Sequence, residues 1–169
     1  MIYWGMTVKL IVLKVRHREN LEELAEVIRR GRTLDGVDGG WQMPKYAELG
    51  DLAIWYAASP DQEYRAYGWV AGTPAKPAGE LVKYYGPVAG VRLLPKPVGR
   101  HVVAAASGFN EKGVGQLAEM VHDREEDFLL AVGFDQRFVA GRELISAEVI
   151  RVLRSMTDRA AGLATIPRA

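Results

Sequence analysis

The chain has 169 residues, of which 49% are hydrophobic and 25% are charged, and its formal net charge is +1. This length and composition predict one globular domain, with room for a short extension, and they exclude a chain that is mainly disordered. The absence of cysteine excludes a disulfide framework, a zinc–thiolate site, an iron–sulfur cluster and a thiol nucleophile. Because no apolar run is long enough for a membrane helix and the first residues do not resemble a signal peptide, we expect a cytoplasmic protein without a membrane partner.

The first half of the chain predicts three strands and one helix. Runs of β-branched and aromatic residues indicate the strands, and the last two are expected to form a meander pair. The helix follows a capping box formed by Asn20 and Glu23, and Leu21 and Leu24 begin its apolar face. The expected strands span residues 7–15, 52–58 and 64–71, and the expected helix spans residues 20–30. The glycine-rich segment 31–50 is expected to be a loop.

The second half of the chain gives weaker signals. Pro95 and Pro97 are expected to end one strand, and Ser146 is expected to cap the last helix. Residues 128–134 and 137–139 fit either short strands or loops. The expected elements are a strand at 88–94, a short strand at 102–106, a helix with Val114, Leu117, Ala118 and Val121 on one face, and a helix at 147–157.

This order of elements predicts an α+β fold, in which a curved mixed β-sheet of about five or six strands carries flanking helices. The pattern leaves open whether the sheet closes into a barrel. We expect residues 1–122 to form the main domain. Residues 123–169 are expected to be a helical C-terminal extension that packs on the same core.

The residue types that support catalysis or metal binding do not occur in recognisable patterns. His17, His101 and His122 match no known motif spacing. The acidic run 123–127 is typical of a solvated helix end, and the glycines between residues 36 and 40 lack the lysine and hydroxyl residue of a phosphate-binding loop. We therefore expect no catalytic residue, no metal and no cofactor.

Aromatic residues in expected loops give the strongest functional signal. Trp41 lies in the glycine-rich segment, where it either covers the core or lines a binding site. Tyr84 and Tyr85 are adjacent, so in an extended chain their side chains point in opposite directions and one of them is free to stack on a planar ligand. Trp55 and Trp69 fall in expected strands, where core packing is the more common role.

Two groups of arginines flank the first expected helix. Although a net charge of +1 argues against bulk coating of nucleic acid, a local rim of arginines would suit phosphate groups. Solvated helix ends explain the same residues equally well, because cations near a helix C-terminus are stabilised by the helix dipole. The candidate phosphate-binding residues are Arg16, Arg18, Arg29, Arg30 and Arg32.

Three stretches of the sequence resemble the EVE domain, a PUA-like domain related to the YTH domain. They are Gly40-Trp41-Gln42-Met43-Pro44, the run from Leu49 to Tyr56, which contains Gly50-Asp51, and the run from Tyr67 to Pro74. The resemblance implies a PUA-like pseudo-barrel over residues 1–122, with an aromatic pocket for one flipped or unpaired base.

The resemblance also implies roles for individual residues. Trp41 would form one wall of the pocket, and Tyr84 or Tyr85 another. Asp35, Asp38 or Ser107 would hydrogen-bond the edge of the base, and the arginines named above would contact phosphates. The implied partner is DNA or RNA carrying a modified base, most simply a methylated one, and a separate nuclease or effector would carry out any cleavage.

Two other functions remain open at this point. A small PUA-like hydrolase acting on a modified nucleoside would need a lysine and a carboxylate in the pocket, for which Lys45 and Glu48 are the candidates. A protein-interaction module would instead use residues 123–169 as a docking surface and would keep the aromatic residues in the core.

Overall fold

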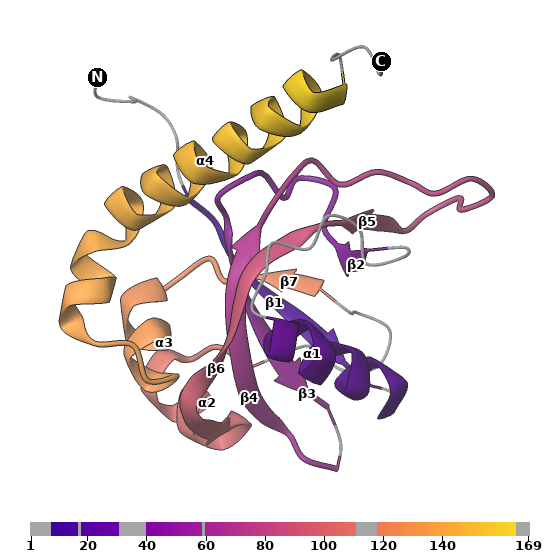
Figure 1. The fold of residues 1–169 in the computed structure, drawn as a ribbon. Coiled ribbons are helices and arrows are strands. Elements are labelled where there is room, and N and C mark those ends of the chain that lie inside the picture. The colour runs from indigo at the N-terminus through magenta and orange to yellow at the C-terminus, as the bar shows by residue number, and fades with distance from the viewer. Residues whose placement is uncertain (1–7, 17, 31–39, 59, 111–117, 165–169) are drawn as a thin grey trace.

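The computed structural model describes residues 8–16, 18–30, 40–58, 60–110 and 118–164. The structure combines β-strands with helices, which confirms the α+β class (Figure 1). The strands are β1 (Leu10–Val15), β2 (Trp41–Met43), β3 (Leu52–Ala57), β4 (Glu63–Val70), β5 (Tyr84–Gly86), β6 (Val88–Gly99) and β7 (Ala118–Met120). The helices are α1 (Arg18–Arg30), α2 (Arg100–Ser107), α3 (Glu125–Ala131) and α4 (Gln136–Ala164).

The main sheet is mixed and has five strands in the order β6-β4-β3-β1-β7. β1 pairs in parallel with β3, from Leu10 opposite Leu52 to Val15 opposite Ala57, and the other neighbours pair antiparallel. All six residues of β1 and of β3 are buried, which explains their nearly continuous apolar sequences. β6 and β7 form the two edges, so the part of the sheet that the structure describes is open rather than a closed barrel.

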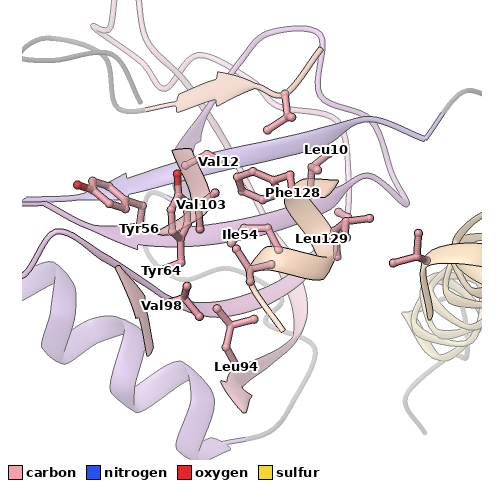
Figure 2. Packing of buried hydrophobic residues seen from close by; sticks show 14 of the residues in the cluster. Leu10, Val12, Ile54, Tyr56, Tyr64, Leu94, Val98, Val103, Phe128 and Leu129 are labelled. Atoms are coloured by element: carbon pink, nitrogen blue, oxygen red, sulfur yellow. The ribbon is translucent and has the colours of Figure 1, made fainter. Parts of the chain in front are cut away.

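The alternation of side chains along β1 and β3 divides the core into two clusters, one on each face of the sheet. The α4 face is covered by α2, α3 and α4 and carries the larger cluster. Figure 2 shows residues of this cluster. The α1 face is covered by α1, which contributes Leu24 and Val27, and by β2. On the α4 face lie, among others, Leu10, Val12, Leu52, Ile54, Tyr64, Trp69, Phe128 and Leu129, and on the α1 face Ile11, Leu13, Trp41, Met43, Ala53 and Trp55.

The C-terminal helices are part of the core on the α4 face. Phe128 of α3 is fully buried, and its ring lies edge-on to Tyr64, with ring centroids 5.4 Å apart. Val139, near the start of α4, belongs to the same cluster. The acidic residues 125–127 occupy the first turn of α3, where the helix dipole favours negative charge, as expected for a helix end.

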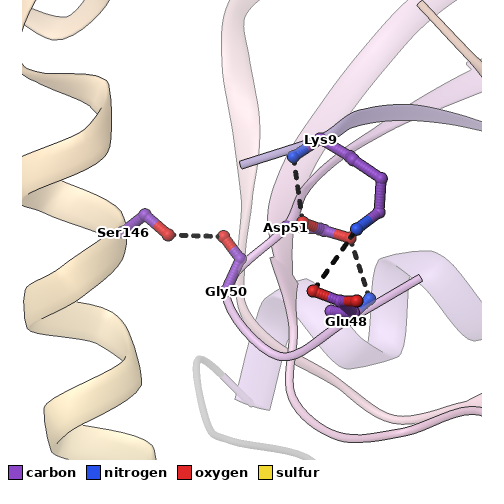
Figure 3. A network of polar contacts seen from close by, with 5 residues as sticks. All are labelled: Lys9, Glu48, Gly50, Asp51 and Ser146. Carbon is purple, nitrogen blue, oxygen red and sulfur yellow. Dashed lines mark hydrogen bonds and ion pairs between the residues drawn. The ribbon is translucent and has the colours of Figure 1, made fainter. Parts of the chain in front are cut away.

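A buried polar seam connects α4 to the start of β3 (Figure 3). The hydroxyl of Ser146 donates a 2.7 Å hydrogen bond to the carbonyl oxygen of Gly50. The carboxylate of Asp51 accepts hydrogen bonds from the backbone N–H groups of Lys9 (2.9 Å) and Glu48 (2.8 Å), and it lies 3.3 Å from the Lys9 ammonium. The residues before β3 are therefore held by α4 on one side and by Lys9, the residue that precedes β1, on the other.

Several expected boundaries were wrong by a few residues or more. α1 begins at Arg18, so Asn20 lies inside the first turn and is not the capping residue. Ser146 does not cap a helix, because α4 already begins at Gln136 and the Ser146 side chain bonds to Gly50 instead. For Ser146, a tertiary contact with a distant part of the chain outweighs the local preference of serine for a helix N-terminus.

The expected end of the strand at Pro95 was also wrong, because β6 continues to Gly99. The register between β4 and β6 shifts here: Tyr64 lies opposite Val98, whereas Ala66 lies opposite Leu93. Residues 94–97 therefore bulge out against a single residue of β4. Prolines are tolerated at such a bulge and on an edge strand, where their missing N–H breaks no ladder.

Two assignments between residues 100 and 121 were wrong in type. The expected strand 102–106 is helix α2, in which Val103 and Ser107 are buried one turn apart and Gly108 ends the helix in a left-handed conformation. The expected helix ending at Val121 falls partly on β7, and its first part lies outside the described residues. Val102 and Val103 favoured a strand, but the three alanines that follow favour a helix.

The segment 128–139 forms the end of α3 and the start of α4 rather than short strands. Among the residues that the structure describes, no helix combines the length and the apolar character needed to cross a membrane.

Candidate functional site

Trp41 lies in a strand rather than in the expected loop. β2 pairs antiparallel with β5, so that Trp41 lies opposite Gly86, Gln42 opposite Tyr85, and Met43 opposite Tyr84. Both strands have only three residues, which is too short for a recognisable pattern in the sequence. The two tyrosines that were expected in a loop are thus also strand residues.

The pairing of β2 and β5 shows which tyrosine shares a face with Trp41. Residues directly opposite each other in an antiparallel pair have their side chains on the same face of the sheet. Within one strand, residues two positions apart also share a face. Tyr84 therefore lies on the face of Trp41 and Met43, and Tyr85 lies on the other face with Gln42. Both tyrosines are half-buried.

Two glycines allow β2 and β5 to approach closely. A Cβ atom on Gly86 would come within 2.6 Å of the Met43 sulfur, so any side chain at this position would displace Met43. Gly40 has a φ of +61°, and a Cβ atom there would lie 2.9 Å from the carbonyl oxygen of Gly86. Glycine is therefore required at Gly40, where the neighbour is backbone, whereas a side chain at Gly86 would require Met43 to move.

Trp41 packs against Trp55 at the centre of the α1 face. The two indole rings are nearly perpendicular, with an interplanar angle of 82° and centroids 5.7 Å apart. Trp41 is 8% exposed and Trp55 is fully buried. The Nε1–H groups of both rings are buried and have no hydrogen-bond partner. Such unpaired buried donors are rare, and each one costs about 1–3 kcal/mol.

A cation lies beside this group of aromatic residues. The ammonium of Lys76 is 5.3 Å from the centroid of the Tyr84 ring, within the range of a cation–π contact. Lys76 follows Ala75, which forms an isolated β-bridge with Tyr85. The face that carries Tyr84 thus combines aromatic rings with a positive charge at its border.

Ser107, the predicted contact to the base edge, lies away from Trp41. It is the last residue of α2, which covers the α4 face, and its hydroxyl donates to the carbonyl of Val103 at 2.7 Å and accepts from the N–H of Phe109 at 3.2 Å. These two bonds satisfy the hydroxyl within the turn that ends α2. Asp35 and Asp38 lie outside the described residues.

The predicted arginine rim is divided by the helix. Arg16 follows β1 and Arg18 begins α1, whereas Arg29 and Arg30 end it. A helix of 13 residues separates its two ends by about 18 Å. The side chain of Arg29 also forms an ion pair with Glu26. The two groups therefore lie at opposite ends of α1, and Arg32 lies outside the described residues.

The residues proposed for a hydrolase form no catalytic pair. Lys45 is exposed in the turn after β2. The carboxylate of Glu48 is also largely exposed and lies 3.5 Å from the ammonium of Lys9, beside Asp51. Burial raises the pKa of Asp51, and hydrogen bonds from the Lys9 and Glu48 backbones and the Lys9 charge only partly offset this effect. In the described part of the chain, no cluster of histidine and acidic residues is arranged to hold a metal ion.

A second aromatic site was missed in the sequence. An apolar groove of about 370 Å³ runs between α4 and the strands β4 and β6. Trp69 and Phe138 line it with tilted rings whose centroids are 6.3 Å apart, and Tyr67 and Arg92 lie at its side. Phe138 came from a segment without a clear sequence pattern, and Trp69, although part of the stretch that resembles the EVE domain, was assigned to core packing in a strand.

Comparison with known proteins identifies the fold but no family. No protein-family model and no curated protein matches the chain. Among solved structures, protein Atu2648 from Agrobacterium tumefaciens is similar, with a TM-score of 0.51 and 15% sequence identity. The match covers 74% of this chain and 91% of Atu2648. At this level of identity the likeness concerns the fold alone.

Proposed function

We propose that the protein is a nucleic-acid-binding module that holds one unpaired, modified base on the α1 face, against Trp41 and Trp55. In this proposal the open sheet is part of a PUA-like pseudo-barrel of the EVE type. One observation carries the proposal: two perpendicular indole rings lie together in the core, and both have a buried N–H group without a partner.

Unpaired indole donors suit a nucleobase for a chemical reason. The edges of all bases present nitrogen or oxygen acceptors, which can accept hydrogen bonds from these donors. The same rings offer aromatic faces for stacking, which contributes about 1–3 kcal/mol per base. A methyl group on the base adds apolar contact and requires no further hydrogen bond. The unfavourable energy of the unpaired donors in the free protein would thus be recovered on binding.

The residues around Trp41 supply the remaining parts of the proposed site. Tyr84 shares its face and forms the second aromatic wall, so Tyr85, on the other face, is not needed for stacking. Lys76, beside Tyr84, places a positive charge where a phosphate would follow the bound base. Arg16 and Arg29 lie at opposite ends of α1, so we propose that only one of them contacts the same stretch of backbone.

Binding requires a local movement. The Nε1 atoms of Trp41 and Trp55 are covered in this structure, so a base reaches them only after neighbouring side chains shift. We therefore expect association to be slower than the typical range of about 10⁵–10⁷ M⁻¹s⁻¹.

Fluorescence anisotropy with short labelled oligonucleotides tests the proposal. Matched single strands would contain an unmodified base, 5-methylcytosine, 5-hydroxymethylcytosine or N6-methyladenine. We expect tighter binding to one modified strand. Trp41→Phe keeps an aromatic ring but removes the N–H donor, and we expect it to weaken that binding by about tenfold, the effect of one lost hydrogen bond in a buried site.

Trp69→Phe is the matched control, because Trp69 is buried to a similar extent (7% exposed) but belongs to the α4 face. We expect it to bind like the wild type. Equal, salt-sensitive binding of all strands by wild type and both variants would show only non-specific phosphate contacts and would refute the proposal. Absence of binding to every strand would refute it as well.

A further inference from the structure

The segment between β4 and β5 projects from the body of the molecule (Figure 1). At its end lie Leu81, which is 84% exposed, and Val82, which is 78% exposed. Leaving one large apolar side chain in water sacrifices about 1.5–3 kcal/mol relative to burying it. Two such residues side by side at the end of a projecting loop suggest that this surface is buried in a complex.

Hydrogen bonds hold this loop in a defined shape. At its base, Ala75 and Tyr85 exchange two backbone hydrogen bonds of 2.9 Å. Near its end, the N–H of Glu80 donates to the carbonyl of Pro77 at 3.0 Å. The carboxylate of Glu80 accepts hydrogen bonds from the N–H groups of Val82 and Lys83, both at 3.1 Å, and these bonds hold the pKa of Glu80 below its ordinary value. The apolar pair is thus presented by an ordered turn.

The charges on the loop suit a polyanion. Lys76 and Lys83 lie on its two arms, on either side of the apolar pair. The acidic residue between them, Glu80, directs its carboxylate at backbone N–H groups rather than at an outside partner. Some DNA-binding proteins insert apolar side chains between stacked bases, while basic side chains nearby contact the phosphates. The loop has the same arrangement, with an apolar pair at its end and a lysine on each side.

We propose that Leu81 and Val82 form a wedge that enters the base stack of a nucleic-acid duplex when one base is drawn out of it. This inference rests on the proposed function, since it assumes that a base occupies the site at Trp41. The loop leads directly into β5, and Leu81 lies five positions before Gly86, which lies opposite Trp41. An extended chain of this length spans about 17 Å. The wedge and the proposed pocket can therefore contact the same duplex.

A comparison of duplex and single-stranded probes tests the wedge. A single strand has no closed stack to fill, so the wedge contributes to duplex binding only. The probes are a short duplex with one 5-methylcytosine, 5-hydroxymethylcytosine or N6-methyladenine and the same modified strand alone. We expect Leu81→Ser with Val82→Ser to weaken duplex binding by about tenfold and single-strand binding by less than about twofold.

The chain offers a matched control for this double variant. Leu144 and Val152 on α4 are another exposed leucine and valine, at 79% and 42% exposure. Leu144→Ser with Val152→Ser makes the same chemical change on a different surface and should leave both affinities unchanged. A third variant, Lys76→Gln with Lys83→Gln, should lower the affinity for both probes, because it removes phosphate contacts. It should also lower the salt dependence of binding.

The outcomes separate the wedge from the base site. If the Leu81/Val82 variant binds the duplex normally, or weakens duplex and single strand equally, the wedge is refuted while the base site stands. If Trp41→Phe leaves both affinities unchanged, the base site is refuted, and the wedge with it. If the Leu81/Val82 variant instead loses binding to anionic phospholipid vesicles and keeps its duplex affinity, the loop contacts membranes and the inference is wrong.

Discussion

The buried serine hydroxyls on one face of the sheet and the buried indole N–H groups on the other differ in their hydrogen bonding. On the α4 face, the hydroxyls of Ser107 and Ser146 are buried at 3% and 0% exposure, and both are hydrogen-bonded. On the α1 face, Trp41 and Trp55 bury their N–H groups without any partner. Both faces are tightly packed, so burial alone does not separate them. Among the described residues, what separates them is that the α1 face brings two unpaired donors together in adjoining rings, whereas on the α4 side the Nη1 atom of Arg142 is also buried without a partner but stands apart from any such pair.

The comparison suggests a division between stability and function. The α4 face carries the C-terminal helices and the polar seam at Gly50 and Asp51, which hold parts of the chain that are far apart in sequence. The α1 face contains donors that lower stability in the free protein. Proteins often accept such local costs at sites that bind ligands. The following predictions test this division, beginning with the largest expected change.

Removing the aromatic centre of the α4 face should cause the largest loss of stability. Phe128→Ala leaves a cavity beside Tyr64 and Phe109, whose rings lie 5.4 and 5.3 Å from that of Phe128. We expect the free energy of unfolding to fall by about 3–5 kcal/mol, measured by urea denaturation. Leu144→Ala, on the exposed side of α4, should change it by less than about 0.5 kcal/mol. Similar losses in both variants would contradict the packing seen in Figure 2.

A side chain at the polar seam should separate α4 from the body. Gly50 has a φ of +95°, and a Cβ atom there would lie 2.5 Å from Ile150 Cδ1 and 2.9 Å from Ser146 Oγ. Backbone strain and overpacking together should cost about 2–4 kcal/mol in Gly50→Ala. Gly141→Ala is the control within α4, because its Cβ would meet its nearest atom at 4.0 Å. It should stabilise the protein by about 0.8–1 kcal/mol, as helix propensity predicts.

The raised pKa of Asp51 should give the wild type a distinct pH dependence. A native carboxyl with a raised pKa keeps a proton that the unfolded chain has already released above about pH 3.9. The contribution of Asp51 to the free energy of unfolding should therefore fall as the pH rises from the pKa of the unfolded chain through the pKa of Asp51 in the native protein. Asp51→Asn cannot titrate and should lack this component. Urea denaturation at a series of acidic pH values measures the difference between the two proteins. A difference that grows with pH in favour of the wild type would mean that the Lys9 ion pair outweighs burial.

Trp41→Phe should have only a small effect on stability although it removes part of a buried side chain. The lost apolar contact is offset because an unpaired donor is also removed, which recovers about 1–3 kcal/mol. We expect a net change below about 1 kcal/mol, measured in the same denaturation experiment. A larger loss would show that the indole N–H is satisfied in solution, and the two faces would then not differ in the way described.

The central strands could be predicted from the sequence, but the pairing of the shortest elements could not. β1, β3 and β4 follow from runs of β-branched and aromatic residues and were found within about three residues. The parallel pairing of β1 with β3 is a long-range property that neither strand reveals alone. At residues 102–106, local preference was ambiguous between two valines and three alanines, and the left-handed turn at Gly108 favours the helix.

The candidate site was predicted in part. Trp41 and Tyr84 were identified because large aromatic residues stood among turn-forming ones. Their common face follows only from the pairing of β2 with β5, and each of these strands has three residues. Trp55 was assigned to the core, which is correct, but no sequence pattern could show that its N–H group lacks a partner. The structure places Ser107 at the end of α2, where the turn after the helix uses its hydroxyl.

The prolines of β6 have a consequence for how copies of the molecule meet. An edge strand with free N–H groups is a template on which another chain can extend the sheet. Pro95 and Pro97 lack these donors, and the bulge at residues 94–97 bends the edge out of register. The proline rings thus prevent another strand from extending the sheet along this part of β6. We therefore expect this segment of the edge to resist intermolecular strand pairing even at high protein concentration.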